Sequence, residues 1–213
     1  MKYACKIFSN IINPQIALEE FKEVEKKFNP IKQHGPYHDG SWKSIALFAA
    51  NGDMKIDKLI KDAEYKKTSA LSFAPQLEAL IDKIPGKKKR VRLLSLPSKA
   101  KIYEHFDSTD SMDSETSRLH MPIITHKDVI FLINNQRMDW TPGNIYYGDF
   151  SFPHSVINNS NINRIHLVID VINNNQLEKI IKKAFDDQLP SDYARKFAQL
   201  KFKIKRKLGL LQY

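Results

Sequence analysis

The sequence predicts a mainly β protein with a barrel or jelly-roll core and helices at both ends. Between Val91 and Val171, short β-rich segments alternate with turn residues, a spacing that favours a barrel or jelly roll over a parallel α/β sheet. The helical period occurs before and after this region. The chain has 213 residues, of which 42% are hydrophobic, so we expect a single domain with a substantial core.

Residues 1–88 are expected to form α/β elements that pack on the barrel. Asn13 and Pro14 indicate a helix start, because an Asn side chain caps the first backbone N–H groups and Pro fits the first helical position. Residues 42–49 fit a buried strand, and a short helix should begin after Pro75 and stop near 85–86. The apolar positions of the first helix are Ile16, Phe21, Val24 and Phe28.

The core of the predicted domain is residues 89–172, where eight β-rich segments follow one another. Turn residues interrupt the pattern at 97–98, 134–135, 142–143 and 158–161. The segments are 91–96, 101–106, 117–125, 128–134, 136–140, 144–149, 154–158 and 164–171.

Residues 173–213 are expected to form two C-terminal helices. The first has apolar residues at the helix period, and the second begins at 190–191. The apolar positions are Leu177, Ile180, Ile181, Ala184 and Phe185 in the first helix and Phe197, Leu200, Ile204 and Leu208 in the second. Lysines surround the second stripe, whose partner is the barrel's outer face, a second subunit in a homo-oligomer, or an anionic membrane surface.

The net charge of +10 is concentrated in two runs. Residues 195–213 carry seven Lys/Arg and no acid, and residues 86–90 add four more. Such runs bind nucleic acid or anionic lipid, but a solvated basic face is the commoner outcome, and neither partner is favoured. Cys5 is the single cysteine, which excludes a disulfide framework. Without a convincing signal peptide or membrane-spanning run, we expect a soluble cytoplasmic protein.

The segment KIYEHFD places His105 and Asp107 two residues apart on a predicted strand. Side chains at i and i+2 point to the same face of a strand, so an imidazole and a carboxylate lie side by side. They supply two ligands of a 2-His-1-carboxylate Fe(II) triad, which leaves three coordination positions open. His154 is a candidate for the third ligand. Taken alone, the pair is more often explained by an exposed strand end, and His154 is more often an ordinary histidine at a strand start.

Four segments together resemble the aspartyl/asparaginyl β-hydroxylase family of Fe(II)/2-oxoglutarate oxygenases. They are KIYEHFD, RLHMPIIT, NIYYGD and FPHSVINNSNINRIHLVID. The resemblance covers residues 91–171 and extends more weakly to 42–48. It implies a double-stranded β-helix core, jelly-roll and cupin-like, with flanking helices. It also favours the barrel's outer face as the partner of the C-terminal stripe, since helices pack there in the family.

The resemblance implies a role for six residues. His105, Asp107 and His154 match the iron ligands. Arg164 matches the residue that pairs with the distal carboxylate of 2-oxoglutarate, as a guanidinium can with two parallel hydrogen bonds. Arg118 and His120 match an Arg-x-His pair that helps to hold the cosubstrate in the family.

The function implied is an Fe(II)/2-oxoglutarate-dependent dioxygenase that uses O2. It would hydroxylate an unactivated C–H bond of an amino acid, a peptide-like molecule or another small molecule, while 2-oxoglutarate is decarboxylated to succinate and CO2. The carboxylate of Asp107 argues for hydroxylation, because related halogenating enzymes lack it. Two alternatives stay open: a peptidyl aspartyl/asparaginyl-type hydroxylase, and a non-catalytic cupin-like binding module.

Overall fold

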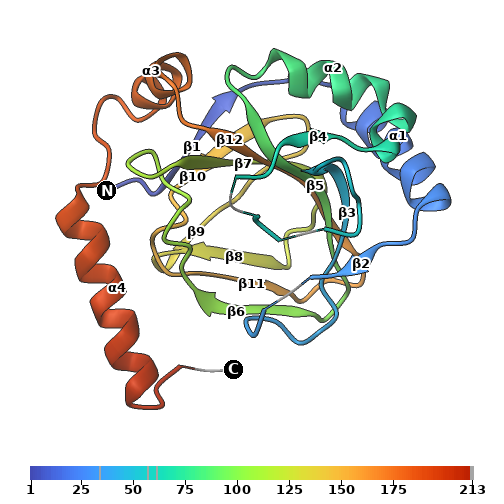
Figure 1. Cartoon of the computed structure of the whole chain (residues 1–213). Coiled ribbons are helices and arrows are strands. Elements are labelled where there is room, and N and C mark those ends of the chain that lie inside the picture. Colours follow the sequence, from blue (N-terminus) through green and yellow to red (C-terminus); the bar gives the residue numbers. More distant parts are fainter. Residues whose placement is uncertain (34, 57, 61, 212–213) are drawn as a thin grey trace.

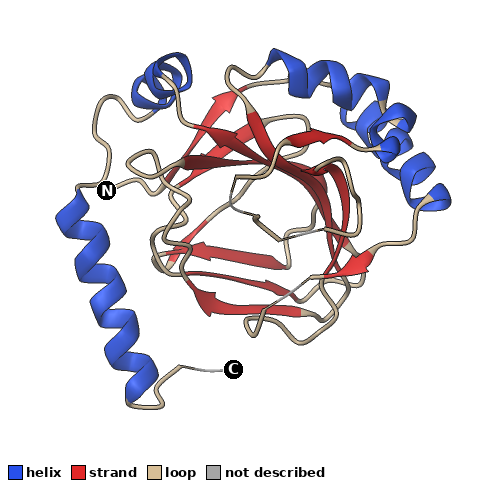
Figure 2. Ribbon diagram, viewed as in Figure 1, coloured by secondary structure: helices blue, strands red, loops and turns tan. Residues whose placement is uncertain are grey.

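Two antiparallel sheets face each other and enclose the centre of the molecule (Figures 1 and 2). The computed structural model describes residues 1–213 except 34, 57, 61 and 212–213. The larger sheet has the order β1 (Ala4–Phe8), β10 (Ile145–Gly148), β7 (Thr116–Ile124), β12 (Arg164–Ile172), β5 (Lys88–Leu96), β3 (Lys43–Ala50) and β2 (Ile31–Lys32), and β4 (Tyr65–Lys67) pairs with β3. The smaller sheet has the order β6 (Lys101–His105), β11 (His154–Asn158), β8 (Val129–Ile133) and β9 (Gln136–Arg137). The predicted double-stranded β-helix, or jelly roll, is confirmed.

Helices cover the outer face of the larger sheet and leave the smaller sheet largely open on its outer side (Figure 1). The helical elements are α1 (Pro14–Lys27), η1 (Ser69–Phe73), α2 (Pro75–Lys83), α3 (Asn175–Ala184) and α4 (Asp192–Lys207). Burial follows this arrangement: eight of the nine residues of β12 are buried, whereas β8 alternates between buried and half-buried positions. A central strand covered on both faces is buried along its length, whereas a strand with one wet face alternates.

The local signals in the sequence act as expected at the helix starts. The Asn13 side chain accepts a hydrogen bond from Gln15 N at 2.9 Å, and Pro14 occupies the first helical position. Ser191 caps α4 by accepting from Ala194 N at 3.2 Å. The predicted helix after Pro75 is α2, which ends at Lys83. These helix predictions are confirmed.

The first 88 residues contribute more to the sheet than the sequence indicated. Strands β1, β2 and β4 escaped the sequence analysis, and they join β3 in the larger sheet itself. β1 pairs with β10, so Cys5 lies opposite Tyr147. The predicted segment 136–140 forms only the two-residue strand β9, because Trp140 turns into the core and is 8% exposed.

The expected packing of α4 is wrong. The stripe predicted to face the barrel is solvent-exposed, with Phe197 47% and Leu200 54% exposed. The helix packs instead through Ala198 and Phe202, and Phe202 meets Phe106 edge-on with ring centroids 5.6 Å apart. The ion pair of the buried Arg195 with Asp149, at 2.7 Å, holds that face against the barrel. Across the described residues, no helix combines the length and apolarity needed to span a bilayer.

Candidate active site

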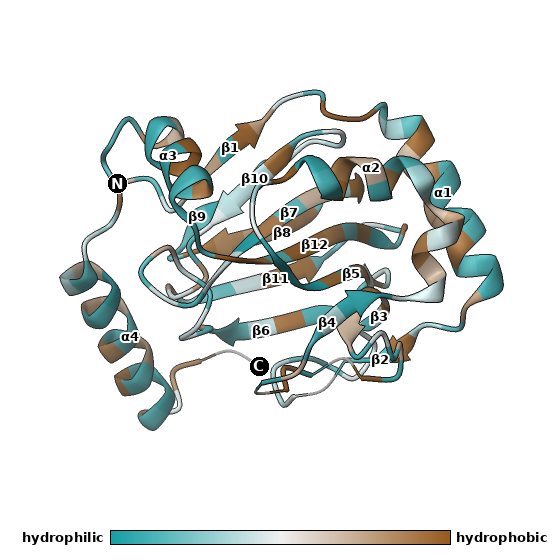
Figure 3. Cartoon of the chain, turned by 45° about the horizontal axis from the view of Figure 1, so that its top comes forward, coloured by the Kyte–Doolittle hydropathy of each residue, from teal (hydrophilic) through white to brown (hydrophobic). Residues whose placement is uncertain are grey.

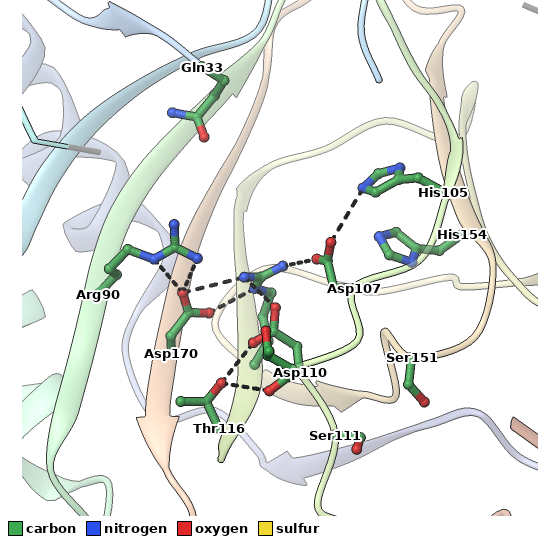
Figure 4. A network of polar contacts seen from close by, with 12 residues as sticks. Gln33, Arg90, His105, Asp107, Asp110, Ser111, Thr116, Ser151, His154 and Asp170 are labelled. Atoms are coloured by element: carbon green, nitrogen blue, oxygen red, sulfur yellow. Dashed lines mark hydrogen bonds and ion pairs between the residues drawn. The ribbon is translucent and has the colours of Figure 1, made fainter. Parts of the chain in front are cut away.

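Strand pairing places two histidines side by side at the end of the smaller sheet. β6 and β11 are antiparallel neighbours, and their register sets His105 opposite His154 with ring centroids 4.2 Å apart. Asp107 follows β6 after a single residue and turns toward the two rings (Figure 4). Ligand atoms of the three side chains all lie within 4.8 Å of one another. The sequence-predicted triad is therefore together in space.

Both imidazoles are oriented by backbone carbonyls. His105 Nδ1 lies 2.7 Å from the Tyr103 carbonyl oxygen, and His154 Nδ1 lies 3.0 Å from that of Phe152. A carbonyl only accepts, so each Nδ1 carries the hydrogen and each Nε2 keeps its lone pair. Burial and then the neighbouring His105 lower the pKa of His154 to about 3. A neutral ring with a free Nε2 is the form that binds a metal.

The carboxylate of Asp107 is held in its ionised form. Burial alone would raise its pKa, but the charge of Arg118, with which it forms an ion pair, and the two imidazoles outweigh burial. The pKa of Asp107 therefore lies well below its usual range. The triad offers two neutral nitrogens and one negative oxygen, a donor set that suits Fe(II).

Arg118 lies at the centre of a charge network rather than open to the cavity. Besides its ion pair with Asp107, Arg118 places Nη2 2.6 Å from an oxygen of Asp110 and donates from Nε to Asp170 at 2.7 Å. Asp170 also pairs with Arg90 at 2.9 Å. Burial first, and then neighbouring carboxylates, raise the pKa of Asp110 to about 6. In this structure Arg118 binds the protein's own carboxylates, and its assignment to the cosubstrate stays a prediction.

Arg164 is a buried cation without a carboxylate partner in the described part of the chain. It is 3% exposed, its guanidinium lies 5.2 Å from the ring centre of Phe131, and its Nη2 lies 3.1 Å from His166 Nδ1. Its Nε has no hydrogen-bond partner among the described residues. Burial lowers the pKa of Arg164 to about 9. Because an unpaired buried charge is costly, the position is suited to an anionic ligand.

His120 belongs to the same buried group as Arg164. Its Nδ1 lies 3.3 Å from His166 Nδ1, so one ring donates and the other accepts. Burial and then the charge of Arg164 hold the pKa of both histidines well below the usual range, which keeps both rings neutral. His120 Nε2 is buried and has no partner among the described residues. His166 thus links Arg164 and His120, two of the three residues predicted to hold the cosubstrate.

A cavity of about 440 Å³ joins these groups. It is lined by the triad, by Arg118, His120 and Arg164, and by the segment that precedes β3. From that segment Tyr37 stacks on His105, with ring centroids 4.8 Å apart and planes 5° apart. Gln33 Nε2 and Trp42 Nε1 are buried donors with no partner in the described chain. The sequence analysis missed Gln33, because an amide that follows the two-residue strand β2 carries no local signal of facing a cavity.

The Arg–Asp network was also missed by the sequence analysis. Arg90 and Asp170 lie opposite each other in the β5–β12 register, and Asp170 lies opposite Arg118 in the β12–β7 register. The only local signal was the alternation of Arg90 and Arg92 on one strand. That signal does not reveal which acid faces them, since cross-strand partners depend on sheet register.

Comparisons with known proteins agree with this geometry. A family model described as aspartyl/asparaginyl β-hydroxylase matches residues 13–174. No curated protein shows significant sequence similarity to the chain. One similar solved structure is a prolyl hydroxylase in complex with a hypoxia-inducible-factor peptide from Trichoplax adhaerens. It is 11% identical, with 85% of this chain and 87% of that chain covered and a TM-score of 0.52. Another is the non-heme α-ketoglutarate-dependent epimerase SnoN of nogalamycin biosynthesis, 9% identical, with 78% and 76% covered and a TM-score of 0.51.

Proposed function

The chain belongs to the aspartyl/asparaginyl β-hydroxylase family, whose model matches residues 13–174, and on this premise we propose that it is an Fe(II)- and 2-oxoglutarate-dependent dioxygenase. The observation that carries the proposal is the triad of His105, Asp107 and His154, with two free Nε2 atoms and one carboxylate within 4.8 Å. When bound, Fe(II) and 2-oxoglutarate supply the chemistry: O2 is consumed, 2-oxoglutarate becomes succinate and CO2, and a substrate C–H bond is hydroxylated.

Arg164 is the proposed partner of the distal carboxylate of 2-oxoglutarate. It is buried, has an unused Nε donor, and lacks an acidic partner within the described chain. His166 contacts its Nη2 and so orients the guanidinium. His120, which lines the same cavity and meets Arg164 through His166, is a further proposed cosubstrate residue. Arg118, which lines the same cavity, orients Asp107 and remains the second proposed cosubstrate cation.

The proposed substrate is an amino acid, a peptide-like molecule or another small molecule with hydrogen-bond acceptors. A cavity of about 440 Å³ has room for 2-oxoglutarate and the reacting part of a substrate. The unpartnered donors Gln33 Nε2 and Trp42 Nε1 line that cavity, and a carboxylate or amide carbonyl would satisfy them. A peptidyl aspartyl or asparaginyl side chain meets the same requirement and is the second candidate.

The proposal is tested by succinate formation from 2-oxoglutarate in the presence of Fe(II), with free amino acids and short peptides as substrates. We expect turnover that requires Fe(II) and a hydroxylated product of the accepted substrate. His105→Ala should abolish stoichiometric binding of Fe(II) or Mn(II), because two ligands do not hold the ion as three do. His126→Ala is the matched control, since His126 is 40% exposed and precedes the Val129 end of β8, whereas His154 pairs with Ile133 at the other end.

Two results would contradict the proposal. Unchanged metal affinity in His105→Ala would remove this histidine from the metal site. A metal-loaded protein that binds 2-oxoglutarate but converts none of it, with or without substrates, would instead support a cupin-like binding module.

A further inference from the structure

The outward face of α4 is an apolar surface that none of the described residues covers. Five residues at helical spacing form it, and we call them the outer stripe. The outer stripe consists of Tyr193 (78% exposed), Phe197 (47%), Leu200 (54%), Ile204 (49%) and Leu208 (64%). Tyr193 and Phe197 stack on each other with ring planes 7° apart. A contiguous exposed stripe of this kind marks an interaction site, whereas single exposed apolar residues are ordinary.

A small rotation of α4 cannot bury the outer stripe against the barrel. The opposite side of the helix is already anchored by Arg195, Ala198 and Phe202, all of which are buried. At 3.6 residues per turn, the centres of the two faces lie about 150° apart around the helix axis. Turning the stripe inward would therefore expose Phe202 and break the ion pair between Arg195 and the buried Asp149. Figures 1 and 3 show α4 at the rim of the molecule, with hydrophobic and hydrophilic residues interspersed along it.

Positive charge borders the outer stripe on both sides. The basic flank consists of Lys196, Lys201, Lys203, Lys205, Arg206 and Lys207. The one acid of α4 is Asp192, which pairs with Lys196 at 2.7 Å. The other five form no ion pair within the described residues. Lys201 Nζ lies over the Phe197 ring, 4.5 Å from its centre, so a basic side chain contacts the stripe directly through a cation–π contact.

The combination of charge and apolar surface selects among three partners. A second copy of the chain would bring two such basic flanks together, and their like charges would repel. Nucleic acid would satisfy the lysines but would leave the aliphatic members of the stripe in water. An anionic bilayer satisfies both, since the stripe enters the acyl boundary and the lysines remain among negative headgroups.

We propose that α4 docks in the plane of a membrane that contains anionic phospholipids, with the outer stripe inserted and the basic flank at the headgroups. The helix does not cross the bilayer. Docking of α4 would also orient the active-site end of the barrel, because the inner face of α4 contacts Phe106, the residue between His105 and Asp107. The proposal does not depend on the enzymatic activity.

The full chain tests the proposal by co-sedimentation with vesicles of phosphatidylcholine alone or mixed with phosphatidylglycerol. We expect binding to the mixed vesicles, little binding to the neutral ones, and weakening as salt rises. The combined variant Phe197→Ser, Leu200→Ser, Ile204→Ser and the combined variant Lys201→Glu, Lys205→Glu should each lower partitioning by about 100-fold or more. Brominated lipids should quench the added indole of an Ile204→Trp variant, because position 204 enters the acyl boundary.

The matched control carries Ile16→Ser, Lys22→Glu and Lys26→Glu on α1, where these side chains are also exposed. It should bind vesicles like the wild type, and all variants should keep the wild-type melting temperature and Mn(II) affinity. Three results would overturn the proposal. They are no vesicle binding by the wild type, stripe variants that turn a dimer into a monomer without loss of vesicle binding, and vesicle binding that the control variant loses equally.

Discussion

At the scale of single residues, the candidate metal ligands are oriented by their own strands. In both histidines the carbonyl two residues earlier accepts from Nδ1, Tyr103 for His105 and Phe152 for His154. The same local bond therefore directs both Nε2 atoms toward the point that Asp107 approaches. A site built on strand ends is rigid before any metal arrives, which lowers the cost of binding one.

Arg164 is expected to affect ligand binding and stability in opposite ways. Arg164→Met should weaken 2-oxoglutarate binding to the Mn(II)-loaded protein by two orders of magnitude or more, since a charged hydrogen-bonded contact of about 3–5 kcal/mol is lost. The melting temperature without 2-oxoglutarate should stay equal or rise, because an unpaired buried cation is removed. Titration calorimetry and thermal unfolding measure the two effects.

Arg137→Met is the matched control for Arg164→Met, because Arg137 is 44% exposed and pairs with Asp139. It should leave 2-oxoglutarate affinity unchanged. Equal affinity in the two variants would assign the distal carboxylate to another cation.

Cys5 should react slowly in the folded protein. Burial raises the pKa of its thiol to about 12, against a usual 9.0, so the thiolate is scarce at pH 8. We expect alkylation by iodoacetamide at pH 8 to be about 100-fold slower or more in the native chain than in the chain unfolded in urea. Mass spectrometry follows the reaction cleanly because the chain has a single cysteine. Equal alkylation rates in the native and the unfolded chain would mean that Cys5 in the edge strand β1 is exposed to solvent.

At the scale of elements, α4 is attached to the barrel by ion pairs of Arg195 with Asp149 and Asp113, by a hydrogen bond from Gln199 to the Ser151 carbonyl, and by the aromatic contact of Phe202. Arg195 Nε donates to Asp149 Oδ2 at 2.7 Å, and Asp149 is fully buried. Its other oxygen accepts from the Ser151 hydroxyl at 2.5 Å. Removing one member of such a pair leaves the other charge desolvated, so the pair decides the direction in which the helix faces.

Arg195→Ala should lower the free energy of unfolding by about 3–5 kcal/mol at pH 7. The loss should shrink as pH falls. Burial raises the pKa of Asp149 above its unfolded value of 3.8, and Arg195 lowers it. Removing Arg195 raises this pKa further, so above the unfolded value the native variant takes up a proton more readily than the wild type and regains stability as pH falls. Lys196→Ala, at a residue whose side chain is 75% exposed, should change stability by about 0.5 kcal/mol or less. Urea titrations at pH 7 and pH 5 measure the free energy of unfolding of both variants. Equal changes in the two variants would contradict the role given to the Arg195–Asp149 pair.

Shortening a side chain to alanine should change stability far more on the buried face of α4 than on its outer face. Phe202→Ala removes a ring that is 5% exposed and should cost about 3–5 kcal/mol. Phe197→Ala removes a half-exposed ring of the outer stripe and should change stability by about 0.5 kcal/mol or less. Chemical denaturation of the two variants compares them directly. A larger cost for Phe197 would mean that the stripe is covered in solution.

At the scale of the whole molecule, the site exists because the two sheets enclose one cavity. The triad comes from the end of the smaller sheet, whereas Arg118, His120 and Arg164 come from β7 and β12 of the larger one. Ligands bound there bridge the sheets, and they bind the folded chain only. Binding is therefore coupled to global stability.

Mn(II) with 2-oxoglutarate should raise the melting temperature. At about 100 times the dissociation constant a ligand adds about 2.7 kcal/mol, which for a chain of this size corresponds to about 5–10 °C. The rise should vanish in His154→Ala and persist in His126→Ala. Differential scanning calorimetry measures it, and an equal rise in both variants would show metal binding elsewhere on the chain.

The sequence by itself determined the features that depend on near neighbours in the chain. Alternation and turn residues located the core strands, and Asn13 with Pro14 set the start of α1. The spacing of His105 and Asp107 put them on one face, because the side-chain period of a strand is two residues. The family resemblance supplied the distant members His154 and Arg164, which no local pattern distinguishes from ordinary buried residues.

Only the tertiary structure decided the features that depend on partners far away in the chain. Sheet register brought Asp170 beside Arg118, so this arginine pairs with carboxylates of the protein itself. The spacing of residues along one strand does not reveal such a pair. Hydrophobic periodicity revealed an apolar stripe on α4 but did not show which face of the helix is buried. That choice rests on Arg195 meeting Asp149, 46 positions apart in the chain, since an ion pair between distant residues forms only after the fold has brought them together.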